Sequence, residues 1–187
     1  MPGARRPKSR KPLVFSLLVL LLLLIVGGVG AWIVVFQPFT IPAITQPQQS
    51  FKDTNLGLSL LYPSGWMVQV DHNTATVHFS DSSHTAQFNI VIAAANWTDA
   101  AQSLQKEVTQ LGMTGLKPGE PVSFAGVSWQ QLQGSVQQNG ANYTEMLLAT
   151  VHGDRLITIM QLAPQATYTD EEQIVFSGMR SSFQFLS

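Results

Sequence analysis

Two histidines and an aspartate around a predicted turn are the residues best suited to bind a metal. His78, Asp81 and His84 follow at three-residue intervals, as H-x-x-D-x-x-H. Imidazole nitrogens and carboxylate oxygens are common zinc ligands, and a hairpin can bring such residues together. His78, however, falls on the polar side of its predicted strand, and Asp81 and His84 are ordinary turn residues. We therefore predict no bound metal and no cofactor, with this trio as the weak candidate for a metal site.

The common catalytic motifs are missing from the sequence. Residues 57–61 and 126–130 come nearest to a nucleophile elbow, but both lack the final glycine of G-x-S-x-G. The sequence has no H-E-x-x-H, no phosphate-binding loop motif and no G-x-G-x-x-G. It also has no cysteine, which excludes disulfides, cysteine nucleophiles and thiolate ligands. These observations predict that the protein is not an enzyme.

Aromatic residues beside turns are candidates for contact with a partner. Tyr62, Pro63 and Trp66 belong to the segment YPSGW, in which proline and glycine form a turn and the rings cover one end of a core. Exposed tyrosine and tryptophan are also common interface anchors. Trp129 precedes a glutamine-rich run, residues 130–138, which predicts either a solvated edge or an amide strip facing a carbohydrate. We take Tyr62, Pro63, Trp66 and Trp129 as candidate partner-binding residues.

Residues 13–36 predict where such a surface operates. This run is apolar and uncharged, and as a helix it would extend about 36 Å, enough to cross a hydrocarbon core of about 30 Å. Segment 1–12 holds five basic residues, and no charged residue follows until Lys52. The positive-inside rule therefore predicts a cytoplasmic N-terminus, a single-pass anchor in the bilayer of the cell membrane and an extracytoplasmic remainder. The alternative is a cleaved signal peptide, whose apolar core is usually about 7–15 residues.

The chain after this predicted anchor is acidic. Residues 37–50 contain three prolines and four glutamines and predict an extended stalk before a domain at 51–187. From residue 37 onward five basic residues stand against eleven acidic ones, a formal charge of about −6. A domain of this charge without a basic stripe is unsuited to nucleic acid, so we predict no nucleic-acid partner.

The order of elements predicts an α+β domain. A helix is predicted from Thr98 or Asp99 to a stop at Gly112, and a final helix from a T-x-x-E capping box at Thr169 and Glu172. A Pro/Gly-rich connection is predicted at 117–119. Seven strands are predicted, at residues 56–62, 66–70, 75–80, 87–94, 127–136, 143–151 and 156–162. One antiparallel sheet with helices on its faces would bury these elements.

The domain resembles the PsbP-like (Mog/PsbP) superfamily. The resemblance rests on Phe51-Lys52-Asp53, on the run GLSLLYPSGW at 57–66, and on the order of elements through the C-terminal helix. It implies an α-β-α sandwich around a central antiparallel sheet, here preceded by one transmembrane helix. Members of the superfamily are mostly non-catalytic binding or accessory proteins, among them extrinsic photosystem II subunits and membrane-tethered bacterial homologues. The resemblance transfers no catalytic residue to this chain.

Together these features predict a membrane-anchored, extracytoplasmic PsbP-like domain that binds a protein or envelope partner without catalysis. Two alternatives stay open. One is a carrier of a small apolar ligand such as a lipid, held between sheet and helix, which requires a large apolar pocket. The other, by analogy with the superfamily, is a photosystem accessory protein.

Overall fold

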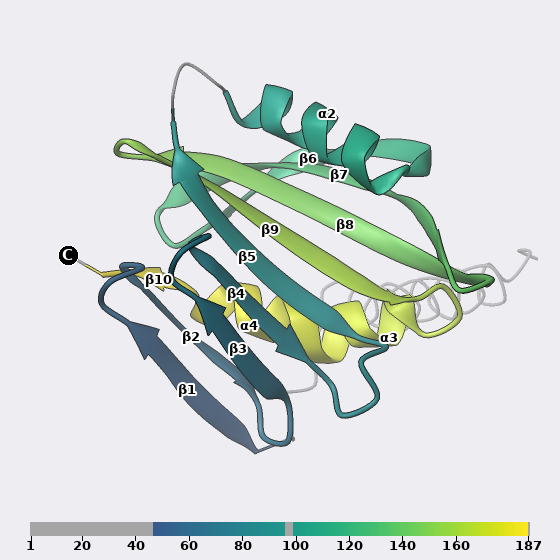
Figure 1. The fold of residues 1–187 in the computed structure, drawn as a ribbon, viewed down its shortest axis with the longest axis horizontal. Helices are drawn as coiled ribbons and strands as arrows, with labels where there is room; N and C mark the ends of the chain where they lie inside the picture. The colour runs from purple at the N-terminus through teal and green to yellow at the C-terminus, as the bar shows by residue number, and fades with distance from the viewer. Residues whose placement is uncertain (1–46, 96–98, 187) are drawn as a thin grey trace, which may run out of the picture. The chain divides into compact units, whose positions relative to one another are not determined.

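Two antiparallel sheets organise the part of the chain that the computed structural model describes, residues 47–95 and 99–186 (Figure 1). The larger sheet contains β3 (Met67–Asp71), β4 (Thr76–Ser80), β5 (Gln87–Ala94), β6 (Thr114–Phe124), β7 (Val127–Gln138), β8 (Ala141–His152) and β9 (Arg155–Pro164). Its strand order is β3-β4-β5-β9-β8-β7-β6. The smaller sheet contains β1 (Gln48–Asp53), β2 (Leu58–Pro63) and β10 (Gln184–Phe185), in the order β1-β2-β10.

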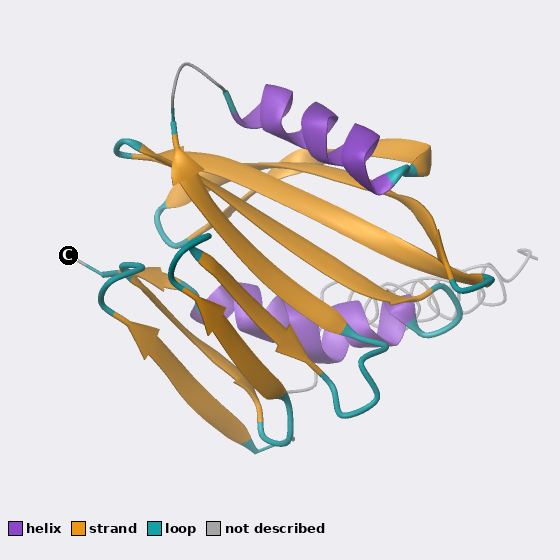
Figure 2. Cartoon of the chain, viewed as in Figure 1, coloured by secondary structure: helices purple, strands orange, loops and turns teal. Residues whose placement is uncertain are grey.

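Helices cover both faces of the larger sheet (Figure 2). Helix α2 (Ala100–Leu111) packs on β7 and β8 through Leu104 and Val108. The opposite face is covered by the smaller sheet and by a C-terminal helical segment made of α3 (Tyr168–Glu171), a π-helical turn η1 (Glu172–Phe176) and α4 (Ser177–Ser182). The predicted α+β architecture, an antiparallel sheet between helices, is therefore confirmed for the described residues.

Predictions for the basic tail (1–12), the transmembrane helix (13–36) and the stalk as far as residue 46 lie outside the described residues. Within 47–95 and 99–186, no helix combines the length and the apolar character needed to cross a membrane. The first strand already begins at Gln48, inside the predicted stalk, because Gln48–Ser50 pair with Leu61–Pro63 of β2.

Alternating side chains give the larger sheet a core on each face. In β8, Leu147 and Ala149 point toward α2, whereas Leu148 points toward the C-terminal helical segment. Leu147, Leu148 and Ile159 are fully buried. The sequence predicts this two-sided burial for β8 and β9 because both strands are apolar on both faces.

Helix α2 begins and ends as the sequence predicts. The Asp99 carboxylate accepts a hydrogen bond of 2.7 Å from the backbone N–H of Gln102, and Gly112 ends the helix in the left-handed conformation at φ 63°. The predicted hairpin turn at Asn139 and Gly140 is also present, with positive φ at both residues.

The predicted connection at 117–119 is wrong, because these residues belong to strand β6. This strand is the outermost of the larger sheet and pairs only with β7 among the described strands. An edge strand tolerates Pro118 and Pro121. Proline lacks a backbone N–H, and on an edge strand the N–H groups that point away from the sheet have no strand to bond. The pairing with β7 shifts register twice: between Thr114 and Lys117, where Gly115 has φ 61°, and between Gly119 and Val122, where Pro121 lies.

The predicted capping box of the last helix is also wrong. Thr169 lies inside α3, and the N-cap residue Thr167 makes no side-chain capping bond. The Glu172 carboxylate pairs instead with the Arg180 guanidinium, an interaction that a local sequence pattern cannot indicate.

Three segments meet at Gly57, the first residue of the motif run GLSLLYPSGW. It has φ 69°, and a Cβ at this position would lie 2.6 Å from a guanidinium nitrogen of Arg155. That guanidinium donates a 2.7 Å hydrogen bond to the Leu56 carbonyl, and the Gly57 carbonyl accepts one of 2.8 Å from the N–H of Leu186. The positive φ favours glycine here, and a Cβ would displace the Arg155 guanidinium from the Leu56 carbonyl.

Candidate functional site

Strand β7 carries a row of polar side chains on the sheet face that otherwise forms a core with the C-terminal helical segment. Trp129, Gln131, Gln133 and Ser135 alternate along the strand and so share this face. Trp129 is fully buried, whereas the three that follow are half-buried. The row therefore runs out of the core toward solvent, and its exposed part carries neutral amide and hydroxyl groups.

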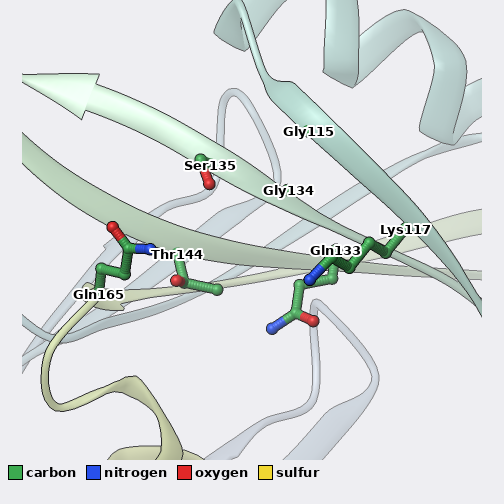
Figure 3. Close-up of a pocket in the computed structure, with 7 residues that line it drawn as sticks. All are labelled: Gly115, Lys117, Gln133, Gly134, Ser135, Thr144 and Gln165. Atoms are coloured by element: carbon green, nitrogen blue, oxygen red, sulfur yellow. The ribbon is translucent and has the colours of Figure 1, made fainter.

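A small pocket, here called the polar pocket, opens over this row (Figure 3). Its volume is about 110 Å³, below the roughly 300–1,000 Å³ typical of sites that enclose a whole small molecule. Its side chains supply one ammonium, two amides and two hydroxyls, and hence both hydrogen-bond donors and acceptors. The residues that line it are Gly115, Lys117, Gln133, Gly134, Ser135, Thr144 and Gln165.

Strand pairing and one loop assemble the polar pocket. Gln133 pairs with Lys117 of β6, and Ser135 pairs with Thr144 of β8. Gln165 follows β9, and its backbone N–H donates a 3.1 Å hydrogen bond to a carbonyl of β8, which keeps the loop beside the pocket. The lining thus comes from four segments, and sequence reasoning found only its central part, the glutamine-rich run.

Next to the polar pocket, Gly119 makes room for the amide of Gln131. A Cβ at Gly119 would lie 2.3 Å from the Gln131 amide nitrogen. That nitrogen donates a 2.7 Å hydrogen bond to the Glu120 carbonyl, so the Gln131 side chain lies across β6.

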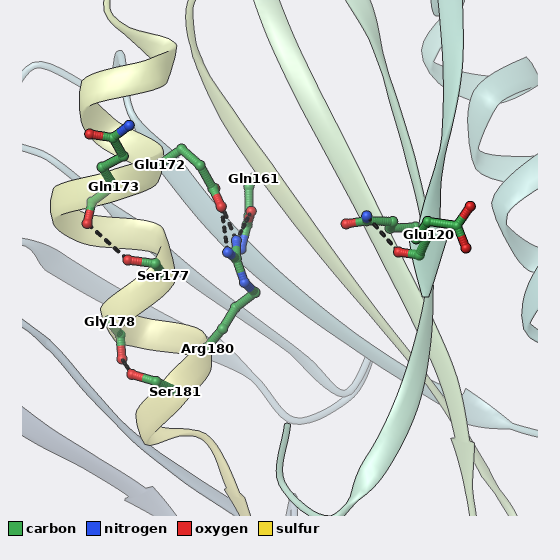
Figure 4. A network of polar contacts seen from close by, with 9 residues as sticks. Glu120, Gln161, Glu172, Gln173, Ser177, Gly178, Arg180 and Ser181 are labelled. Atoms are coloured by element: carbon green, nitrogen blue, oxygen red, sulfur yellow. Dashed lines mark hydrogen bonds and ion pairs between the residues drawn. The ribbon is translucent and has the colours of Figure 1, made fainter. Parts of the chain in front are cut away.

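A cluster of charged and amide groups joins the C-terminal helical segment to the same sheet face (Figure 4). The Arg180 guanidinium donates hydrogen bonds of 2.7 Å to Gln161 Oε1 and 2.9 Å to Glu172 Oε2. Glu172 and Arg180 are eight residues apart, and in a regular α-helix residues at this spacing lie about 80° apart around the axis. The π-helical turn η1 absorbs one extra residue and so brings both to one side.

This cluster lies beside the polar row. Gln161 pairs with Met146, which pairs with Gln133, so roughly 10 Å of sheet separates the cluster from the polar pocket. Gln161 Nε2 and the Tyr168 hydroxyl are buried without a partner among the described residues. Burial, with a smaller contribution from the charge of Glu172, raises the pKa of Tyr168, so its hydroxyl remains a donor at every ordinary pH.

On the opposite face, under α2, Glu145 is a buried acid. It is 4% exposed, and its carboxyl group makes no hydrogen bond or ion pair with another described side chain. Burial, together with the negative charge of Glu107 on α2, raises the pKa of Glu145 to about 7. Glu145 lies on the α2 face of the sheet, on the far side from the polar pocket, and does not line it.

The predicted contact residues of YPSGW lie away from the polar pocket. Tyr62 and Pro63 belong to β2 in the smaller sheet, and Trp66 precedes β3, the edge strand of the larger sheet opposite β6. The N–H of Trp66 donates to the Pro63 carbonyl at 3.2 Å across a turn whose glycine has φ 93°, as in a type II turn. The Tyr62 ring lies 5.4 Å from that of Phe79, and the Trp66 ring 6.3 Å from that of Phe176. Pro63 is buried and both aromatic residues are half-buried, so the motif has a structural role; its contact with a partner stays a prediction.

Trp129 is fully buried and does not join the YPSGW residues. Its ring stacks on Phe124 at 4.5 Å and meets the edge of Phe183 at 5.8 Å. Its indole N–H donates to the Phe124 carbonyl. Because Trp129 offers no surface to a ligand, we remove it from the candidate contact residues; the amide row that follows it remains.

The trio His78, Asp81 and His84 is not assembled as a metal site. Asp81 accepts a 2.7 Å hydrogen bond from the backbone N–H of Thr85 and thereby holds the β4–β5 turn. His78 Nδ1 lies 3.1 Å from the Asn89 amide oxygen on β5. Among the described residues, no group of three or more His, Cys, Asp or Glu side chains is arranged to hold a metal ion.

Comparison with protein-family models and with curated proteins gives no match. Solved structures do match. The cyanobacterial PsbP (CyanoP) of Synechocystis sp. PCC 6803 superposes with a TM-score of 0.56 at 16% identity, over 74% of this chain and 92% of CyanoP. LpqN of Mycobacterium tuberculosis, described as involved in cell envelope biogenesis, superposes with a TM-score of 0.51 at 15% identity, over 76% of this chain and 87% of LpqN.

The domain has a PsbP-like fold. The resemblance predicted from Phe51-Lys52-Asp53 and the run at 57–66 is thereby confirmed at the level of fold. The PsbP-like domain also matches a protein from Bacteroides thetaiotaomicron, with a TM-score of 0.53 at 17% identity, over 74% of this chain. It spans only 48% of that longer protein.

Proposed function

We propose that this chain is a membrane-anchored accessory protein whose PsbP-like domain lies outside the cell and binds an envelope component through the polar pocket, without catalysis. The observation that carries this proposal is the polar pocket itself. It presents amide and hydroxyl groups and one ammonium on a sheet face that is elsewhere covered by apolar packing.

The fold supports a binding role. CyanoP and LpqN consist largely of this domain, since the match covers 92% and 87% of their chains. The description of LpqN as involved in cell envelope biogenesis favours an envelope component as the partner. The likeness to CyanoP is one of fold and does not favour a photosystem role for this chain.

The membrane location rests on the sequence. The uncharged run 13–36, preceded by five basic residues, is the pattern of a single-pass anchor with an extracytoplasmic C-terminal part. An anchor would hold the domain near envelope components and raise their effective concentration, so that a weak site suffices.

The apolar-ligand carrier is the less favoured function. A lipid carrier needs a large cavity with apolar walls. The polar pocket is small, open and lined by amides and hydroxyls, and the space between sheet and C-terminal helical segment is filled by buried side chains such as Phe88, Phe176 and Met179.

Site-specific photo-crosslinking tests the proposal in native membranes. The full-length chain carries a photoreactive phenylalanine derivative in place of Gln137, an exposed glutamine two residues beyond the pocket-lining Ser135 on the same face of β7, so that the pocket itself stays intact. The matched control carries it in place of Gln130, an exposed glutamine on the other face of β7.

We expect irradiation to attach an envelope component to position 137 and not to position 130, and mass spectrometry to identify it. Identical products from both positions, or no product from position 137, would contradict binding through the polar pocket.

A further inference from the structure

The polar pocket also indicates the class of ligand that it binds, on the premise of the proposed function. Its side-chain groups are two amides, two hydroxyls and one ammonium, and no acidic residue lines it. Amides and hydroxyls donate and accept at the same time, as do the hydroxyl groups of a sugar. A ligand of this kind can satisfy each lining group, whereas an apolar ligand would leave them unpaired at a cost in affinity.

Charge argues against a polyanion. The described residues carry five basic and eleven acidic side chains, and Lys117 is the single cation that lines the polar pocket. Nucleic acids and anionic lipid surfaces are bound through clusters of Lys and Arg. The ligand is therefore a molecule with little or no net charge.

The size of the pocket argues for a segment of a chain molecule. A pocket of about 110 Å³ that opens to solvent accommodates a small group and cannot enclose a whole ligand. The polar row extends beyond it along β7, with Gln131 on one side and Gln137 on the other. This continuity provides further hydrogen-bonding positions for the neighbouring units of a linear ligand.

A folded protein surface fits the polar pocket less well. Protein interfaces concentrate binding energy in aromatic and arginine side chains, and none of the pocket-lining residues is aromatic or an arginine. Trp129, the aromatic residue nearest in sequence, is fully buried.

We infer that the polar pocket binds one sugar unit of an uncharged glycan chain, with Gln133, Thr144 and Gln165 as hydrogen-bonding residues. Each hydrogen bond replaces one to water, so the affinity for a short oligosaccharide is low, in the millimolar range. Attachment of the protein to the membrane beside a polymeric glycan compensates for this low affinity.

Saturation-transfer NMR on the full-length protein in lipid nanodiscs tests this inference, because the method detects weak binding to large particles. The probes are three neutral oligosaccharides: chitotetraose, maltotetraose and cellotetraose. The variants are Gln133→Ala and Thr144→Ala, with Gln130→Ala as the matched control on the opposite face, and empty nanodiscs as the blank. Circular dichroism checks that each variant is folded.

We expect saturation transfer to at least one oligosaccharide with the unaltered protein and with Gln130→Ala, and at least a fivefold weaker signal with Gln133→Ala and Thr144→Ala. Equal signals from all variants would place any sugar binding elsewhere and overturn the inference. No transfer to any of the three probes would also overturn it. If photo-crosslinking at position 137 then captures a protein, the proposed function stands and only the glycan assignment fails; if it captures nothing, both fail.

Discussion

Replacing Glu145 with glutamine is expected to stabilise the domain at alkaline pH. Glu145 lies on β8 beneath α2, with 4% of its surface exposed, and burial together with Glu107 raises its pKa to about 7 from an ordinary value of 4.5. At pH 8 the folded protein must keep an ionised carboxylate in an apolar environment, while the unfolded chain ionises it freely. Glutamine has the same shape and no charge.

The pKa difference sets the size of the effect. A pKa raised from 4.5 to about 7 corresponds to about 3 kcal/mol of lost stability once both states are ionised. The sign follows from linkage: the folded state binds the proton more tightly, so the penalty is absent below pH 4.5, grows between pH 4.5 and 7, and is complete above pH 7. The Glu145→Gln variant should therefore gain up to about 3 kcal/mol of unfolding free energy at pH 8 and almost none at pH 4.5.

Urea unfolding of the full-length protein, followed by near-ultraviolet circular dichroism at pH 4.5 and pH 8, measures this difference. Glu120→Gln is the control, since Glu120 is an exposed acid on edge strand β6, and its substitution should shift stability by less than about 0.5 kcal/mol at either pH. A Glu145→Gln variant that is no more stable at pH 8, or equally stabilised at both pH values, would refute the burial argument.

The remaining predictions concern two tight contacts. Gly57→Ala should lower the unfolding free energy by about 2 kcal/mol in urea titrations, because alanine is strained at φ 69° and its Cβ would displace the Arg155 guanidinium from the Leu56 carbonyl. Gly126→Ala, at φ 77° with open space around it, should lower the unfolding free energy by only about 1 kcal/mol. Equal losses would contradict the contribution of Arg155. Arg180→Met should lower the unfolding free energy in the same urea titrations by about 2–3 kcal/mol, because it leaves the half-buried Glu172 carboxylate without its partner. Adding Glu172→Gln to that variant should recover part of the lost unfolding free energy. If the effects of the two single substitutions simply add in the double variant, an interaction between Glu172 and Arg180 is contradicted.

Where local signals were strong, the sequence predicted the fold well. The hairpins that connect β7, β8 and β9 follow from alternating or fully apolar runs separated by turn residues, and α2 follows from its N-cap and its glycine stop. The motif run 57–66 predicted the PsbP-like fold through its resemblance to the superfamily, and the structure shows that two of its glycines, Gly57 and Gly65, have positive φ.

Predictions failed where long-range pairing overrides local preference. The segment 117–119 contains proline and glycine and nevertheless forms part of β6, because an edge strand tolerates them. Glu172 is eight residues from Arg180 and meets it only through a π-helical turn. The polar pocket combines four segments, and its lining depends on strand order and register, which a single sequence does not determine.

Cysteine labelling in cells tests binding through the polar pocket, and it is possible because the chain contains no cysteine of its own. Single cysteines are introduced as Ser135→Cys in the polar pocket, where the hydroxyl becomes a thiol and the proposed ligand-binding side chains stay intact, and as Gln130→Cys on the opposite face of β7. A membrane-impermeant maleimide is applied to intact cells and to purified full-length protein. We expect position 130 to react in both samples, and position 135 to react in the purified protein and to be protected in cells by the bound envelope component. Equal labelling of position 135 in both samples would contradict binding through the polar pocket, and labelling of position 130 in the purified protein alone would contradict an extracytoplasmic domain.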